Sequence, residues 1–399
     1  MISCYLDSQD YSTLTDPKSD TPDRRAIAET LRHLARSKQV RFAFSAAAVC
    51  EAVAITPDAS RLAELKAELL SDLCGSNALV SFDRLLNAEV KALVSKSGRP
   101  VDMFDPQGRW FPEIPVDESP QATWDKMKEL AQTDITIGSS RQQRRAKARL
   151  LIKNGKPRAA FKAHMEMQDP SSAVEQVLKS YPMKVEHAEM MVRYGLGRAT
   201  EREFTEALMD SLADPRWMMK WFTNQHAMSS PIADLVRKPG RELGNLMRAL
   251  ADSSKRWAEF LKSSGLNSNR TAKSGEIALQ WQEMERRQLV AVTQKAAVAG
   301  GFHFVGDSAA DVEIHCPGIT AAIKSLYSSV WENVGGGRKE EPSDSQPVDA
   351  IHALYAPYVQ VFRADRFMAP HIQKYVKGSG TIVVPKLTQL VKTLETQVR

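Results

Sequence analysis

Apolar and polar positions follow two alternating patterns over residues 1–95. Short, largely apolar runs at 2–6, 41–45 and 78–82 have the length of buried β-strands. Longer segments at 24–37 and 61–73 place apolar side chains three and four positions apart, which is the spacing of an amphipathic helix. Because strands alternate with helices, we expect parallel strands that are joined by helical crossovers.

The segment 96–344 has a different pattern, in which helical periodicity follows a loop rich in Pro, Gly and aromatic residues. The predicted helical stretches are 121–132, 141–163, 171–194, 201–212, 231–263, 274–299 and 319–333. Strand signals are nearly absent there, and a Gly-rich polar connection covers 335–343. We therefore expect 96–344 to form a mostly α-helical insertion.

The α/β pattern returns after this segment, with a helix at 349–356, strands at 358–362 and 381–384, and a final helix at 387–398. Neither end of the chain has enough strands to bury both faces of a parallel sheet. The predicted fold class is therefore an α/β domain split between 1–95 and 345–399, with three α/β/α layers and a parallel sheet built from both ends. A long insertion in a surface loop costs little free energy, so this division is physically reasonable.

Four acidic residues stand where such a fold concentrates its chemistry. Asp7 follows the first strand, Glu51 lies in an Ala-rich helix, Asp349 opens a late helix, and Asp365 follows a late strand. The carboxyl ends of parallel strands meet at one edge of the sheet. Carboxylates that gather there repel one another unless a cation joins them, and oxygen ligands suit Mg²⁺ or Mn²⁺. The sequence thus predicts a metal-dependent enzyme that activates water to hydrolyse phosphodiester bonds.

The two ends of the chain resemble the PIN-like nucleases of the PIN/FEN-like superfamily. Tyr5-Leu6-Asp7-Ser8 is similar to the opening hydrophobic–Asp–Ser/Thr pattern of that family, and Glu51 falls where its helix carboxylate is expected. The segments 349–356 and 361–368 are similar to the elements that supply its third and fourth acids. The resemblance implies that Asp7, Glu51, Asp349 and Asp365 are the catalytic metal ligands of an endonuclease. It favours single-stranded RNA as the substrate, with DNA as the alternative.

Two positions depart from the family pattern, and they keep a second function open. Gln9 stands where many members have Asn, and Arg363 stands where a small hydroxyl residue is common. The alternative is a non-catalytic module that binds nucleic acid or protein on an inactive PIN-like fold. A phosphotransferase of the haloacid dehalogenase type ranks last, because Asp7-Ser8-Gln9-Asp10 lacks the required DxD spacing. An active nuclease of this kind would suit a toxin or an antiviral (anti-phage) defence role.

Each carboxylate also has a purely structural interpretation. Asp7 and Asp349 are placed to cap helices, and Asp365 precedes Arg366, with which an exposed ion pair would form. Glu51 is harder to explain without a partner, because its neighbours are apolar. Asp10, Asp344 and His352 are expected around the metal ligands, with His352 one helical turn after Asp349 and on the same face. A core histidine is an equally good interpretation of His352.

A long basic run is the second functional signal. No Asp or Glu occurs from Ile135 to Met165, a segment that contains many Lys and Arg residues. We expect six of them to contact phosphates: Arg141, Arg144, Arg145, Lys147, Arg149 and Lys153. An acidic protein partner bound through the helical insertion would explain the run equally well.

Composition adds broad limits to this prediction. The net charge of +6 and the pI near 9.0 mildly favour a polyanionic partner. Four cysteines without CxxC spacing indicate buried thiols in a reducing compartment, so we expect a cytoplasmic protein without disulfides. No stretch of apolar residues is long enough for a membrane-spanning helix, and the acidic N-terminal segment does not resemble a signal peptide.

Overall fold

The computed structural model describes most of the two ends of the chain and parts of its middle. The described residues are 1–53, 56–98, 102–111, 152–153, 156–157, 170–180, 183–195, 198–224, short runs between 238 and 263, 275–304, 306, 308–334, 343 and 345–398. The chain divides into two compact units. One comprises Met1–Pro112 with Gln225–Arg399, and the other comprises Glu113–Asn224. The boundaries expected from the sequence, 1–95 with 345–399 and 96–344, stay a prediction.

The first unit is built on a four-stranded parallel sheet with the strand order β2-β1-β5-β6. Its strands are β1 (Ile2–Tyr5), β2 (Val40–Ala43), β5 (Val361–Arg363) and β6 (Ile382–Val384). The first strand of the chain therefore lies in the interior of the sheet, between β2 and a strand from the far end of the sequence. The prediction of an α/β fold with a parallel sheet is confirmed.

The register of the strands places one row of apolar side chains across the sheet. Tyr5 pairs with Ala43 on one side and with Phe362 on the other, and all three belong to one buried cluster. The Tyr5 and Phe362 rings stack with their centroids 5.1 Å apart. Cys4 points to the opposite face and is also fully buried. Both faces of β1 are covered, as is usual for a parallel sheet.

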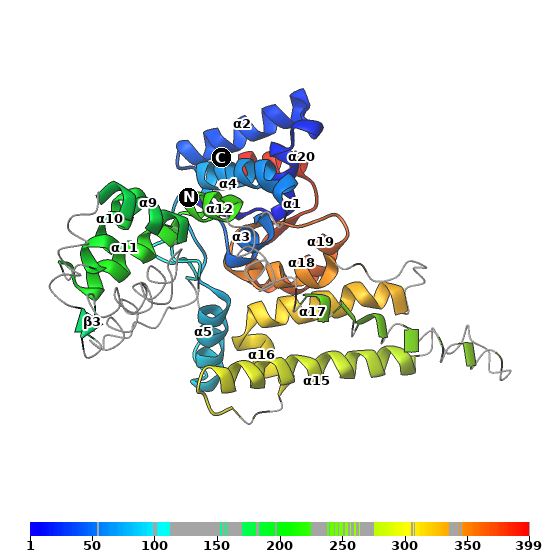
Figure 1. Cartoon of the computed structure of the whole chain (residues 1–399). Helices are drawn as coiled ribbons and strands as arrows, with labels where there is room; N and C mark the ends of the chain where they lie inside the picture. The colour runs from blue at the N-terminus through cyan, green and yellow to red at the C-terminus, as the bar shows by residue number, and fades with distance from the viewer. Residues whose placement is uncertain are drawn as a thin grey trace. The chain divides into compact units, whose positions relative to one another are not determined.

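The helices of the first unit come from both ends of the chain (Figure 1). Those before the second unit are α1 (Ser8–Thr15), α2 (Pro22–Arg36), α3 (Ala46–Ala52), α4 (Ser60–Cys74) and α5 (Phe82–Val94), with the 3₁₀ turns η1 (Pro17–Ser19) and η2 (Pro57–Ala59). Those after it are α15 (Gly275–Ala299), α16 (Ala309–His315), α17 (Pro317–Val334), α18 (Ser345–Ala353), α19 (Met368–Val376) and α20 (Leu387–Val398), with η3 (Ala356–Tyr358) and η4 (Lys377–Ser379). α20 contacts β1, β5 and β6, and α17 packs against α18 and α19.

The prediction of a strand at 78–82 is wrong. Ala78 and Leu79 form only single bridges, with Phe44 and Phe104 respectively, and α5 begins at Phe82. The segment is nevertheless deeply buried, because Ala78 and Leu79 are both fully inaccessible to solvent. Its apolar character therefore comes from burial in the core and not from membership of the sheet. The residue that precedes α5 is Ser81, and Asp83 lies within the first turn of the helix.

The elements expected at 349–362 are shifted. α18 begins at Ser345 and ends at Ala353, and η3 occupies Ala356–Tyr358, where we expected the late strand to start. Pro357 lies in the first turn of η3, where its missing N–H costs no hydrogen bond. β5 is consequently only three residues long.

The second unit is described by helices and one short strand pair. The helices are α9 (Pro170–Ser180), α10 (Val185–Gly195), α11 (Glu201–Ala213) and α12 (Pro215–Asn224). Met183, Ala188 and Phe204 form its buried cluster, and Phe204 stacks on Tyr194 at 5.0 Å. The prediction of a helix over 141–163 is wrong in two places. Ile152–Lys153 and Lys156–Pro157 instead pair as the antiparallel strands β3 and β4. Asn154-Gly155 between them is a hairpin signal that apolar periodicity alone does not reveal.

Among the described residues, no helix combines the length and the apolar character that crossing a membrane requires.

Candidate metal centre

The parallel sheet brings three polar side chains to one edge. Asp7, Ser45 and Asp365 each stand two residues beyond the end of a strand, β1, β2 and β5 respectively. Because these strands are adjacent and parallel, their carboxyl ends lie side by side. This is the edge at which open α/β folds bind ligands.

Asp7, Glu51 and His352 form a compact group of potential metal ligands at this edge. Each offers one ligand atom, and these atoms all lie within 4.8 Å of one another. Asp7 comes from the β1–α1 junction, Glu51 from α3 and His352 from α18. Asp7 and His352 are buried, and Glu51 is partly exposed, so the group is open to solvent on the side of Glu51.

Hydrogen bonds fix the orientation of the His352 ring. Its Nε2 lies 2.7 Å from Glu51 Oε2, and its Nδ1 lies 2.6 Å from the Tyr5 hydroxyl. The Tyr5 hydroxyl also lies 2.7 Å from Ser45 Oγ. Burial alone would lower the pKa of His352, but the Glu51 carboxylate, assisted by Asp7, raises this pKa above its usual value.

Asp349 is the acidic residue with the least structural explanation. It lies inside α18 and not at its start, so the capping role considered for it is wrong. Burial, together with the carboxylates of Asp7, Asp365 and Glu51, raises the pKa of Asp349 well above its usual value. Its buried Oδ2 has no hydrogen-bond partner among the residues that the structure describes. An unsatisfied carboxylate oxygen beside other carboxylates is costly unless a cation or a proton joins it.

Asp365 has a capping role and lies near the cluster. Its Oδ1 accepts a hydrogen bond from the Met368 backbone N–H, at the start of α19. The expected ion pair with Arg366 is absent from the described part of the chain. Asp365 is not one of the ligand atoms within 4.8 Å of each other, but it contributes to the raised pKa of Asp349. The structure therefore brings Asp7 and Glu51 together and places Asp349 and Asp365 around them.

Asp10 and Arg363 form a buried ion pair behind Asp7. Asp10 Oδ1 lies 3.0 Å from Arg363 Nη2, and Asp10 Oδ2 accepts a hydrogen bond from the Asp7 backbone N–H. Burial raises the pKa of Asp10 to about 8, although the Arg363 guanidinium opposes this rise. Asp7 itself caps α1, because its Oδ1 accepts a hydrogen bond from the Gln9 N–H at 3.4 Å. Asp7 therefore caps α1 and also belongs to the group of potential metal ligands, so the two interpretations are compatible.

The local electrostatics favour a cation at this group. Burial raises the pKa of Asp7, Glu51 raises it further, and His352 and Arg363 oppose them. Carboxylate oxygens suit Mg²⁺ and Mn²⁺, while an imidazole is more usual with transition metals. The donor set of Asp7, Glu51 and His352, with Asp349 beside it, therefore fits Mn²⁺ at least as well as Mg²⁺.

Several residues expected at the site lie outside the described residues. They are Asp344, Arg141, Arg144, Arg145, Lys147 and Arg149. Lys153 is described only as a residue of β3 in the second unit.

Glu89 is a buried acid that the sequence analysis did not identify. Its carboxylate accepts hydrogen bonds from the backbone N–H groups of Gly318 and Ile319, at 2.5 and 3.0 Å, and from the Tyr358 hydroxyl. It thereby caps the N-terminus of α17 from α5. The available signal was its position four residues after Leu85, on the apolar face of a helix. Glu89 therefore holds α5, α17 and η3 together.

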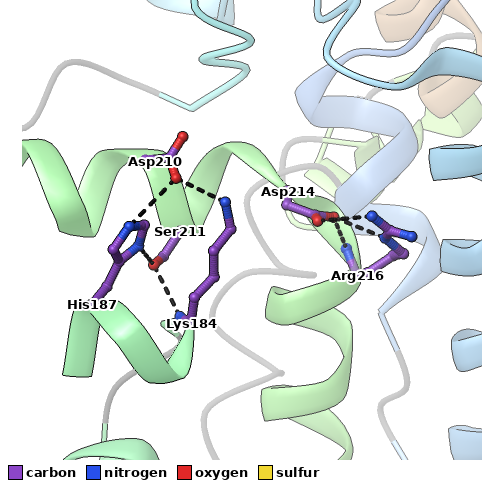
Figure 2. Close-up of polar contacts among 6 residues, drawn as sticks. All are labelled: Lys184, His187, Asp210, Ser211, Asp214 and Arg216. Atoms are coloured by element: carbon purple, nitrogen blue, oxygen red, sulfur yellow. Dashed lines mark hydrogen bonds and ion pairs between the residues drawn. The ribbon is translucent and has the colours of Figure 1, made fainter. Parts of the chain in front are cut away.

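A second polar group lies in the other unit (Figure 2). His187 Nδ1 is 2.6 Å from Ser211 Oγ, and His187 Nε2 is 3.6 Å from Asp210. These residue types resemble a Ser-His-Asp arrangement. However, Ser211 is fully buried, so no substrate reaches its hydroxyl, and its Oγ accepts a hydrogen bond from the Lys184 N–H. These hydrogen bonds therefore have a structural role and connect the start of α10 to α11.

Comparison of the chain with models of protein families, with curated protein sequences and with solved structures gives no match.

Proposed function

We propose that the protein is a PIN-like, divalent-metal-dependent endonuclease that hydrolyses phosphodiester bonds, with single-stranded RNA as its substrate. The observation that carries this proposal is the convergence of Asp7, Glu51 and His352 within 4.8 Å, at the carboxyl edge of a parallel sheet. The unpartnered Asp349 Oδ2 supports it, because a cation would satisfy this oxygen. The resemblance of both chain ends to PIN-like nucleases provides the fold-level analogy.

The residues have separate roles in this proposal. Asp7, Glu51 and Asp349 would hold the cation, with His352 as a further ligand or as a hydrogen-bond partner of Glu51. When bound, a divalent cation supplies Lewis-acid activation of water and stabilises charge at the phosphate. Tyr5 orients His352, and the Arg363–Asp10 pair holds the N–H of Asp7 in place. Such supporting contacts decide whether ligands keep a productive geometry.

A non-catalytic module that binds nucleic acid or protein is the second candidate. The capping bond of Asp365 and the cation of Arg363 beside the cluster favour it, because both reduce the negative charge available to a metal.

Cleavage assays separate the two candidates. We expect the purified protein to nick single-stranded RNA with Mn²⁺ and to stop when EDTA is added. Asp349→Asn should remove this activity, whereas Asp58→Asn, which changes an exposed carboxylate outside the cluster, should not. Absent cleavage with retained RNA binding would support the binding module. Cleavage that resists EDTA would exclude the metal-dependent mechanism.

A further inference from the structure

A cavity of about 430 Å³ lies among α15, α16, α17 and α19, in the first unit. α15 and α17 pack against each other along this part of the fold (Figure 1). The volume is within the range of small-molecule sites. None of the residues that line the cavity belongs to the candidate metal centre.

Three aromatic side chains line the cavity: Trp281, Trp331 and Tyr375. Trp281 is buried, and its Nε1 donates a hydrogen bond to the Tyr327 carbonyl at 3.1 Å. The Trp331 ring centroid lies 5.8 Å from that of Trp281. Trp331 and Tyr375 are both partly exposed, so their rings keep surface that a ligand can cover. Exposed aromatic surface inside a cavity suits a flat ring.

The cavity also carries an excess of positive charge. Its lining contains Arg286, Lys324 and Lys374 but only two carboxylates, Glu285 and Glu313. Both carboxylates are occupied by the Lys324 ammonium, at 3.7 and 2.6 Å. Arg286 and Lys374 have no carboxylate at ion-pair distance among the residues that the structure describes. Lys374 does lie close enough to Glu285 to lower the pKa of that carboxyl, but neither cation is held in an ion pair among these residues, so both can approach an anion.

Two of the positive charges lie beside the Tyr375 ring. The ammonium groups of Lys324 and Lys374 lie 5.6 and 5.1 Å from the centroid of the Tyr375 ring. A ligand on these rings would therefore bring an attached anionic group close to Lys374. A planar ring that carries a phosphate combines both requirements, because aromatic faces bind bases and Lys or Arg binds phosphate.

We propose that this cavity is a nucleotide-binding site, with the base against Trp331 and Tyr375 and the phosphate at Lys374 and Arg286. The site is separate from the metal centre and does not depend on nuclease activity. The same chemistry is present in a free mononucleotide and in the phosphorylated end of a nucleic-acid strand.

Isothermal titration of the full chain in EDTA tests the proposal without involving a metal. We expect 5′-AMP to bind, and adenosine and inorganic phosphate to bind at least tenfold more weakly, because each offers half of the contacts. Trp331→Leu and Lys374→Ala should each weaken 5′-AMP binding at least tenfold. Lys377→Ala, which removes an exposed lysine three positions further on, should leave the affinity unchanged. Thermal melting would verify that each variant is folded.

A 5′-phosphorylated oligoadenylate identifies the source of the ligand. If the oligoadenylate binds more tightly than 5′-AMP and loses the same affinity in both variants, the natural ligand is the phosphorylated end of a strand. If the oligoadenylate binds more weakly than 5′-AMP, the natural ligand is a free nucleotide. The proposal is overturned if 5′-AMP and the oligonucleotide both fail to bind to the wild-type chain. It is equally overturned if folded Trp331→Leu and Lys374→Ala variants bind 5′-AMP as the wild type does.

Discussion

The Glu51 carboxylate lies 2.7 Å from Nε2 of His352, although 301 positions separate the two residues in the chain. Neither residue belongs to a strand. Their contact exists because β1 lies between β2, which leads into the helix of Glu51, and β5, which follows the helix of His352. The candidate site thus depends on the sheet joining the two ends of the chain.

Asp7→Asn should stabilise the metal-free protein while removing cleavage. Burial and Glu51 raise the pKa of Asp7, which means that the folded environment disfavours its charge at neutral pH. Asn keeps the shape and remains a good cap for α1. We expect a higher melting temperature in EDTA and a loss of cleavage activity of at least about 100-fold. Losing a residue that only hydrogen-bonds a metal ligand costs up to about 100-fold, and losing a ligand itself should cost at least as much.

The matched control for this change is Asp58→Asn, which neutralises an exposed carboxylate. It should alter neither the melting temperature nor the cleavage rate. Undiminished cleavage by Asp7→Asn would rule out Asp7 as a ligand.

Tyr5→Phe should weaken metal binding without removing any ligand. The change deletes the hydroxyl between Ser45 and His352, which leaves two buried polar groups without this partner and costs about 1–3 kcal/mol of unfolding free energy. A His352 ring that is less firmly held should lower Mn²⁺ affinity by about 10–100-fold, measured by titration calorimetry.

Tyr355→Phe provides the comparison, because its equally buried hydroxyl donates to the Val80 carbonyl. It should destabilise the fold and leave Mn²⁺ affinity unchanged. If both variants lost affinity to the same extent, general loosening of the core would explain the effect, and Tyr5 would have no special role.

Glu89 should make the protein less stable as pH rises towards neutrality. Burial raises the pKa of Glu89 to about 7 from its usual value of 4.5. Between these values the unfolded chain loses the proton first, so the folded state binds more protons and the unfolding free energy falls with increasing pH. The full difference corresponds to about 3 kcal/mol, at about 1.4 kcal/mol per pH unit.

Glu89→Gln cannot titrate and should lack this part of the slope, as measured by urea denaturation across the same pH range. This variant should keep a smaller slope of the same sign from other buried acids, among them Asp10. Glu68→Gln, at an exposed position on α4, should behave as the wild type does. Parallel pH profiles for Glu89→Gln and the wild type would contradict the raised pKa of Glu89.

Neutralising Arg144, Arg145, Lys147 and Arg149 should weaken nucleic-acid binding about equally for all sequences. If these side chains hold phosphates, each lost contact should reduce the slope of log K against log salt by about 0.7 for single strands. Binding titrations at several salt concentrations would measure it. A slope that did not change would assign the basic run to a protein partner or to solubility.

A chain that ends at residue 340 should lose cooperative unfolding of its N-terminal strands. It lacks β5, and with it Phe362 and Tyr355, whose rings stack on Tyr5. Hydrogen exchange of the β1 amides would report the loss. Protection of these amides equal to that of the full chain would contradict the division of the domain between the two ends.

Short sequence patterns predicted the acidic residues of the candidate site but not the contacts that connect them. Asp7 was predictable because it follows a strand at the carboxyl edge of a parallel sheet, and Glu51 because a carboxylate among apolar neighbours needs a partner. The spacing of Asp349 and His352 correctly placed them on one helix face. The contact of His352 with Tyr5 spans 347 positions, and no local pattern encodes such a contact.

The fold shows the same limit. The end of the chain was predicted well, and α20 has the expected bounds at Leu387–Val398. The apolar run at 78–82 was assigned to a strand because burial in a core loop and burial in a sheet produce the same composition. Glu89 was overlooked because its partners, the Gly318 and Ile319 N–H groups and the Tyr358 hydroxyl, are all more than 200 positions away.

Because β1 lies between β2 and β5, the sheet can be completed only after β5 has been synthesised. Cys4 pairs with Val361, so a growing chain must add more than 350 residues before β1 obtains its second neighbour. At translation rates of about 5–20 residues per second, this takes about 20 to 70 seconds. For most of that interval Asp7 and Glu51 exist without Asp349 and His352. A nascent chain therefore has only part of the candidate site until α18 and β5 have been synthesised, and any activity that depends on the site cannot begin earlier.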